Sequence, residues 1–451
     1  MQCRNAAKYP FNFRPLVCAA FGLGTGVAIG MHISGARALL AALLLLIAAY
    51  IMHMKKQRAA TVMLVCAAAG LLRVAGYAFL PREEVSEIIE NARFSRNHTP
   101  TALMPMVESL YARCDALFNE ASPLARAILL GDRSTLGYFQ RYAFRACGVS
   151  HTLALSGLHV SALTLVLLRC IPPNRPRVRA AFVFAFLGIY CAVAGFPASL
   201  MRAAIMFMCI VLAPLCLRRN DTASALSLAF IIIVCAEPLS IYSAGFCLSF
   251  AAVAGIAMLY APIMCRLPSV LAPVGTTVAA TLGTLPFTVM FFGEFSTYSI
   301  IANIFIVPLI TLALPIGLIA LVLSYISAPL GALLAIPARL MLGASESIGA
   351  AIASLPYAQI KLSGFNGLTC ALYFAALIVL SKYCLMDRNK KLIICCNRGI
   401  HSKDVAERLC QNGYNAESLE GGYRAWLLDA VANPEEKDNE EDFCKNVEQS
   451  I

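Results

Sequence analysis

The sequence predicts an all-α polytopic membrane protein. Hydrophobic residues make up 59% of its 451 positions, only 14% are charged, and the mean hydropathy is +0.73. Soluble globular proteins carry about 25% charged residues. About twelve apolar runs approach the ~20 residues that a helix needs to cross a bilayer. We therefore expect about twelve transmembrane helices, with a small α/β segment at the carboxyl end.

The apolar runs extend through most of the chain. They fall at 15–32, 38–54, 60–80, 150–169, 180–197, 200–217, 222–236, 244–263, 273–293, 299–325, 329–354 and 367–385. The run 222–236 is short and 329–354 is interrupted by Arg339 and Glu346, so these two match a span least well. The first run has no obvious cleavage site, and we interpret it as a retained anchor rather than a signal peptide.

Gly22, Gly26 and Gly30 recur every four residues in the first run. This spacing puts them on one face of a helix, where a second helix can approach closely. Glycine is also simply tolerated in membrane helices, so both interpretations stay open.

Most of the 18 cysteines lie inside apolar runs, where they act as small hydrophobic residues. No Cys-x-x-Cys pair with zinc spacing occurs. The sequence therefore predicts no structural metal, and no cofactor is expected.

Basic residues cluster at the boundaries of the apolar runs, and the formal net charge is +11. With twelve spans, all the clusters fall on one face, which the positive-inside rule makes cytoplasmic. Both termini are then cytoplasmic and residues 81–148 are extracytoplasmic. The clusters are Arg4 to Arg14, Lys55 to Arg58, Arg169 to Arg179, Arg218–Arg219 and Lys382 to Lys391.

The chain divides into five segments. Residues 1–80 hold the amino-terminal transmembrane helices, and 149–385 form the main transmembrane core. Residues 81–148 form a short amphipathic segment, in which Ser134 is expected to cap a helix. Residues 386–428 contain the α/β segment. Residues 429–451 carry eight acidic residues against two lysines and are expected to be a disordered tail.

Four blocks of the core resemble the competence domain of the ComEC family, bacterial inner-membrane proteins of DNA uptake. The blocks are "ILLGDRSTL" with "AFRACGVSHTLALSGLHVSAL" (128–163), "PASLMRAAIM" (197–206), "AEPLSIYSAGFCLSFAAVAGIAML" (236–259) and "LGTLPFTVMFFGEFSTYSIIANIFIVPLITLALPIGL" (282–318). Their order and spacing resemble the family over most of 122–325. Many relatives also carry a soluble domain of OB type, for which 81–148 is too short, so this segment is interpreted as vestigial. Others end in a metallo-β-lactamase-like domain, but no H-x-H-x-D-H cluster occurs here, so no nuclease activity is expected.

The carboxyl segment "LIICCNRGIHSKDVAERLCQNGYNAESLEGGYRAWL" (392–427) resembles the second half of a rhodanese domain. An apolar strand at 392–395 leads into a loop that ends before a helix. The resemblance makes Cys396 the persulfide carrier, supported by Gly399, His401 and Ser402. A thiol facing a helix amino terminus favours the thiolate form, which can accept and transfer sulfur. His401 stands where the family usually has arginine.

The stretch "HTLALSGLHV" brings His151, Ser156 and His159 to the start of an apolar run. We expect one helix, with His151 at its outer boundary and Ser156 beside His159. Ionisable residues at membrane depth usually face a cavity or pair internally, so lining an aqueous path is favoured for His159. Interfacial placement or packing, a Ser–His hydrolase, and a metal site remain alternatives. The hydrolase lacks a nearby acidic residue, and the metal site lacks a third ligand.

Arg202 and Asn303 are the other polar residues expected in the path. A guanidinium at membrane depth needs a partner or a polar cavity, and it can bind phosphate. The alternative is that Arg202 extends to the interface.

The resemblance implies an inner-membrane channel component that translocates single-stranded DNA during natural transformation. Its implied partners are the bilayer, a DNA-receptor protein outside and a motor ATPase or helicase inside, and a homo-oligomer stays open. No G-x-x-x-x-G-K-[ST] motif occurs, so the energy is expected to come from a partner. Two alternatives are a membrane-tethered sulfurtransferase acting through Cys396 and a transporter of another anionic or polar solute.

Overall fold

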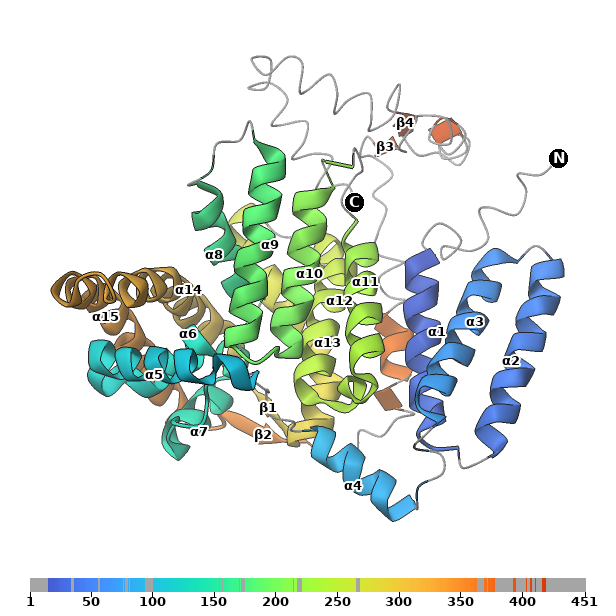
Figure 1. Cartoon of the computed structure of the whole chain (residues 1–451), viewed down its shortest axis with the longest axis horizontal. Helices are drawn as coiled ribbons and strands as arrows, with labels where there is room; N and C mark the ends of the chain where they lie inside the picture. The colour runs from blue at the N-terminus through green and yellow to red at the C-terminus, as the bar shows by residue number, and fades with distance from the viewer. Residues whose placement is uncertain are drawn as a thin grey trace.

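The computed structural model describes residues 15–362 with short gaps at 34–35, 56, 76, 78–79, 81, 94–99, 154, 156, 170, 172–174, 214, 217–220 and 265–267. Beyond residue 362 it describes 369–370, 372–377, 392–394, 403, 406–407, 410 and 416–418. Within these residues the fold is almost entirely helical (Figure 1).

Fifteen α-helices of the described chain lie in the order α1 Pro15–Gly30, α2 Ala36–Met54, α3 Arg58–Arg73, α4 Arg82–Arg93, α5 Met104–Phe118, α6 Ser122–Leu130, α7 Tyr138–Ala146, α8 Gly157–Arg169, α9 Pro176–Val193, α10 Ala198–Leu212, α11 Thr222–Ala236, α12 Ala244–Met264, α13 Ala272–Phe292, α14 Ser299–Leu323 and α15 Ala328–Ala353. Four short strands are β1 Glu294–Ser296, β2 Gln359–Lys361, β3 Leu392–Ile394 and β4 Ala416–Ser418.

The helices agree with the predicted apolar runs in position but not all in length. Six described helices, namely α2, α9 and α12 to α15, are long and apolar enough to cross a membrane. Four others, α1, α8, α10 and α11, are apolar but shorter. The chain is therefore a multi-pass membrane protein by length and composition, and its twelve-span count stays a prediction. The run 367–385 lies largely outside the described residues.

Glycines let α1 and α3 pack with almost no space between their backbones. A Cβ atom added to Gly22 would overlap the carbonyl of Met63, and one added to Gly26 would overlap the carbonyl of Ala67. Gly70 of α3 faces the carbonyl of Leu23 in the same way. Hydrophobic burial drives helix association only weakly inside a bilayer, so such close van der Waals packing replaces it. The close-approach interpretation of the glycine repeat is confirmed.

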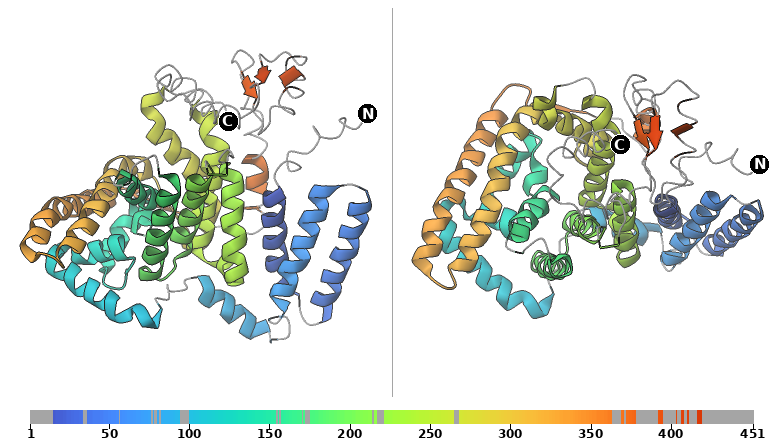
Figure 2. Two further views of the ribbon diagram at one scale, coloured as in Figure 1. Left: turned by 45° about the horizontal axis from the view of Figure 1, so that its top comes forward. Right: turned by 90° about the horizontal axis from the view of Figure 1, so that it is seen from above.

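A single hydrophobic core joins the segment before α8 to the helices after it. Phe118, Leu124 and Ile128 from α5 and α6 are fully buried together with Ile306 and Leu314 of α14. Helices α14 and α15 pack side by side and run across the direction of α9 to α11, as Figures 1 and 2 show. The amphipathic helices α5 and α6 thus become part of the main bundle.

A small antiparallel sheet fastens the ends of two long helices. Strand β1 follows α13, strand β2 follows α15, and Phe295 pairs with Ile360. The hydroxyl of Ser296 also donates to the carbonyl of Ala146, 2.7 Å away, at the end of α7. The sheet therefore links α7, α13 and α15.

The predicted strand at 392–395 is present as β3, which pairs in parallel with β4. The acidic tail 429–451 lies outside the described residues.

We predict that Gly26→Ala destabilises the protein by about 1–3 kcal/mol, because the added methyl forces α1 away from α3. Gly188→Ala in α9 is the control, since nothing lies within 4 Å of a Cβ atom there. Thermal unfolding of the two variants in detergent measures the difference. Equal unfolding temperatures for both variants would contradict the packing described for α1 and α3.

Candidate functional site

The stretch that holds His151 and His159 is not one helix. Residues Ser150–Leu153 form a short 3-10 helix, and α8 begins only at Gly157. The expectation that both histidines share one helical face is therefore wrong. Gly148, with a φ of +72°, ends the preceding helix in a left-handed turn and sets the 3-10 helix apart. Ser156 lies outside the described residues.

The two histidines occupy different environments. His151 is exposed on the 3-10 helix, whereas His159 lies within the first turn of α8 and is only 1% exposed. Of the two, His159 is therefore the one that faces the interior of the bundle. Burial of this kind fits both a polar path and simple packing, so the path-lining role of His159 stays a prediction.

Arg202 is buried in the bundle beside the start of α8. It lies in the second turn of α10, whose N-cap is Pro197, and is only 6% exposed. A Cβ atom placed on Gly157 would lie 3.4 Å from its Nη2 atom. Its Nη1 atom is 4.0 Å from the sulfur of Met206. The side chain of Arg202 is therefore enclosed by the described bundle, and the alternative that it extends to the membrane interface stays open.

The guanidinium of Arg202 is left incompletely bonded by the described residues. Its Nε atom is buried without a hydrogen-bond partner there, and no described carboxylate forms a salt bridge with it. A buried cation without a partner lowers the stability of the fold by an amount on the order of several kcal/mol. A residue of this kind at membrane depth usually marks a polar path or a binding site.

Asn303 adds a second unsatisfied group from another helix. Its Oδ1 atom is buried and has no hydrogen-bond partner among the described residues. Asn303 lies on α14. Both α14 and α10 pack against α8. The hydroxyl of Ser199 fastens α10 to the chain before α8 by donating to the carbonyl of Leu155, 2.8 Å away. Helix α8, which carries His159, thus packs against both helices that carry these unsatisfied polar atoms.

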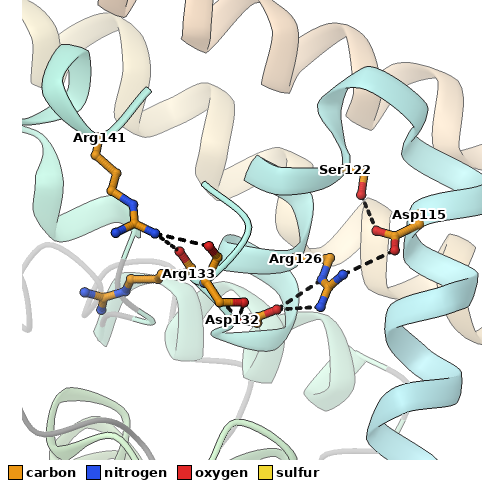
Figure 3. Close-up of polar contacts among 7 residues, drawn as sticks. Asp115, Ser122, Arg126, Asp132, Arg133 and Arg141 are labelled. Atoms are coloured by element: carbon orange, nitrogen blue, oxygen red, sulfur yellow. Dashed lines mark hydrogen bonds and ion pairs between the residues drawn. The ribbon is translucent and has the colours of Figure 1, made fainter. Parts of the chain in front are cut away.

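A polar network that the sequence analysis missed lies between α5 and α7 (Figure 3). Arg126 donates to Asp132 from Nη2 at 2.6 Å and from Nε at 3.1 Å, and to Asp115 from Nη1 at 3.2 Å. Its guanidinium also lies over the ring of Tyr111, 4.2 Å from the centroid. The hydroxyl of Ser122 donates to Asp115.

Ser134 belongs to this network and does not cap a helix, so that prediction is wrong. Both its amide and its hydroxyl donate to Asp132, at 2.9 and 2.6 Å. Helix α7 begins later, after Gly137. An aspartate two residues before a serine is the signature of such an Asx turn, which competes with capping. Burial raises the pKa of Asp132, but hydrogen bonds from Ser134 and Arg126 outweigh it and leave the pKa below its ordinary value.

The residues predicted for sulfur transfer, namely Cys396, Gly399, His401 and Ser402, lie outside the described residues. The parallel pair of β3 and β4 is the described part of that segment.

The fold and the buried polar site define a polytopic α-helical membrane protein whose bundle holds an arginine with no salt-bridge partner among the described residues. The family described as "Competence protein" matches residues 128–386, more than half of the chain. The chain therefore belongs to the ComEC family of competence proteins. Arg202, His159, Asn303 and Asp132 all lie within the matched region.

A curated relative supports this assignment. ComE operon protein 3 of Bacillus subtilis (strain 168) is 31% identical over 207 residues, which cover 45% of this chain and 26% of the relative. The chain thus spans about a quarter of the length of the relative it matches. No solved structure matches the chain. The family match ends at residue 386, where the predicted rhodanese-like segment begins, so it lends that resemblance no support.

We predict that Asp132→Asn lowers the free energy of unfolding at pH 7 by about 1–3 kcal/mol, because Arg126 loses its closest acceptor. The folded pKa of Asp132 lies below its ordinary value, so its contribution is complete above the ordinary carboxyl pKa of ~3.9 and is lost as the pH falls through the lowered value. The stability difference should therefore begin to shrink only below about pH 4 and vanish once the pH lies below the lowered pKa of Asp132.

Unfolding in detergent at several pH values measures this convergence. Glu120→Gln is the control, since Glu120 is exposed in the adjacent turn. A stability difference that stays constant from neutral to acid pH would show that the Asp132 carboxylate is not the stabilising group.

Proposed function

We propose that this protein conducts single-stranded DNA across the bacterial inner membrane during natural transformation. The observation that carries the proposal is the buried guanidinium of Arg202, whose Nε atom has no partner in the described bundle. Membership of the competence family supplies the biological setting.

The chemistry around Arg202 suits a phosphate. A guanidinium is a planar, permanently charged donor that can hold two phosphate oxygens at once. The first residue of α8, Gly157, lies beside it, and helix amino termini present free N–H groups and partial positive charge to anions. Together these donors offset phosphate charge where the dielectric constant is low.

The remaining polar groups suit a path that ignores base sequence. His159 and Asn303 offer neutral donors and acceptors, and neither belongs to a base-reading arrangement on a recognition helix. Sequence tolerance is what transport of arbitrary DNA requires, since backbone contacts position a nucleic acid without reading it.

The proposal also fixes the orientation and the partners. With twelve spans, the positive-inside rule predicts that both termini are cytoplasmic, and the proposal then has DNA entering from the side of residues 81–148. A receptor protein would deliver the strand outside, and a motor ATPase or helicase would draw it in. Assembly of several copies around one path is compatible with this arrangement.

We predict that deleting the gene abolishes natural transformation in a competent host, and that Arg202→Gln reduces the transformation frequency by about tenfold or more through loss of one charge-assisted contact. Arg73→Gln is the matched control, because Arg73 is exposed at the end of α3. Membrane levels of each variant are compared by immunoblot. Normal transformation in the deletion strain would refute the proposal and favour transport of another anionic solute.

We predict that Cys396→Ala leaves the transformation frequency unchanged, because the proposed path does not use this thiol. Complementation of the same deletion strain measures it. Thiosulfate:cyanide sulfur transfer by the intact protein that is lost on this substitution, together with lost transformation, would instead make sulfur transfer part of the function.

A further inference from the structure

Helix α7 exposes three aromatic side chains that the proposed path does not use. Tyr138 is 77% exposed, Phe139 83% and Tyr142 44%. The rings of Tyr138 and Tyr142 are stacked, with centroids 6.5 Å apart and planes 13° apart. Phe139 meets Tyr138 edge to face at 5.8 Å. The three rings form one contiguous aromatic surface.

Two exposed arginines have no acidic partner among the described residues: Arg141 on α7 itself, and Arg133, whose backbone Arg141 contacts. The Nη2 atom of Arg141 donates to the backbone carbonyls of Arg133 and Ser134, at 2.6 and 3.3 Å. Asp132 turns toward Arg126 instead, as Figure 3 shows. No described carboxylate forms a salt bridge with Arg133 or Arg141. The surface therefore presents two charges that an external anion can neutralise.

The apolar face of α7 is already used for packing. Phe144 and Ala146 are buried in the main core, and Gln140 bonds to Glu346 of α15 at 2.8 Å. Tyr138, Arg141 and Tyr142 share the opposite, exposed face at helical spacing. A helix that lies on a membrane separates its apolar face from its basic face. Here aromatic and basic side chains alternate on one face, which is the pattern of surfaces that bind single-stranded nucleic acid.

We propose that Tyr138, Phe139 and Tyr142 form a stacking platform for the bases of single-stranded DNA, and that Arg133 and Arg141 contact its phosphates. This inference rests on the proposed function and gives it a receiving surface. The chain passes from α7 through one 3-10 helix directly into α8, where Gly157 meets Arg202. The predicted topology puts α7 outside, on the side from which DNA arrives.

The first experiment measures binding of a fluorescent oligothymidine to the full-length protein in lipid nanodiscs. The triple variant Tyr138→Leu, Phe139→Leu, Tyr142→Leu keeps apolar area but removes the stacking surface. We expect its Kd to rise by about tenfold or more, because each base that stacks on an aromatic ring adds to the affinity. Arg133→Gln is expected to weaken binding and to reduce its dependence on salt. Tyr50→Leu, at an exposed aromatic of α2, is the control.

A second experiment separates DNA from lipid. Phe139→Trp in a Trp426→Phe background places a single fluorophore on the platform. We expect oligothymidine to quench it and brominated lipids to leave it bright. Quenching by brominated lipids without DNA would overturn the platform and identify α7 as a membrane-seated helix. Unchanged oligothymidine binding by the triple variant would also overturn it.

The two proposals fail separately. If Arg202→Gln impairs transformation while the triple variant transforms and binds normally, the platform is refuted and the conduit stands. If the deletion strain transforms normally, the proposed function is refuted, whatever α7 binds.

Discussion

The pairing of Arg126 with Asp132 is the interaction on which the outer part of the bundle depends. It closes the turn after α6, whose apolar residues Leu124, Ala125 and Ala127 to Leu130 are buried in the core. It also holds the Asp132 carboxylate away from Arg133 and Arg141, which follow in the chain. The guanidinium of Arg126 pairs with two carboxylates and covers a tyrosine ring. The energy of these contacts offsets the cost of desolvating the charge at the edge of an apolar core. One network therefore both anchors α6 and leaves Arg133 and Arg141 without an acidic partner among the described residues.

The hydrogen bonding of Arg202 differs from that of Arg126. Arg126 has acceptors for both ends of its guanidinium, whereas the described surroundings of Arg202 offer a methionine sulfur and a helix start, but no carboxylate. A buried charge without hydrogen-bond partners destabilises the fold. In a site with only a structural role, we expect selection to supply a partner for the guanidinium or to replace the arginine. The cost is consistent with a site that is completed by a ligand. The comparison thus separates an arginine that maintains the fold from one that, under the proposed function, would bind an anion.

Local sequence rules predicted what local forces determine. Apolar runs located the helices, the spacing of Gly22 and Gly26 predicted the α1–α3 contact, and an apolar run located β3. Rules of the same kind failed where groups compete over a few residues. Ser134 had two available roles, and the carboxylate of Asp132 decided between them. Strands β1 and β2 are three residues each, too short to show an alternating pattern, and they exist because the ends of α13 and α15 meet. The burial of Arg202 and the partner-free atom of Asn303 depend on helix packing that no spacing encodes.

The small sheet and its neighbours explain how α7 and the bundle can act as one unit. Arg145 at the end of α7 pairs with Glu294 of β1 at 3.1 Å, and Gln140 bonds to Glu346 of α15. Gly148 allows the chain to turn against Ser296 and Ser299, where any Cβ atom would clash. These contacts fix α7 from both ends before the chain continues into α8. A flexible surface would lose conformational entropy each time it ordered around a DNA strand, whereas a surface held in place does not. On the proposed platform, rigid attachment of α7 would let its aromatic and basic side chains meet a strand at a constant position relative to the start of α8.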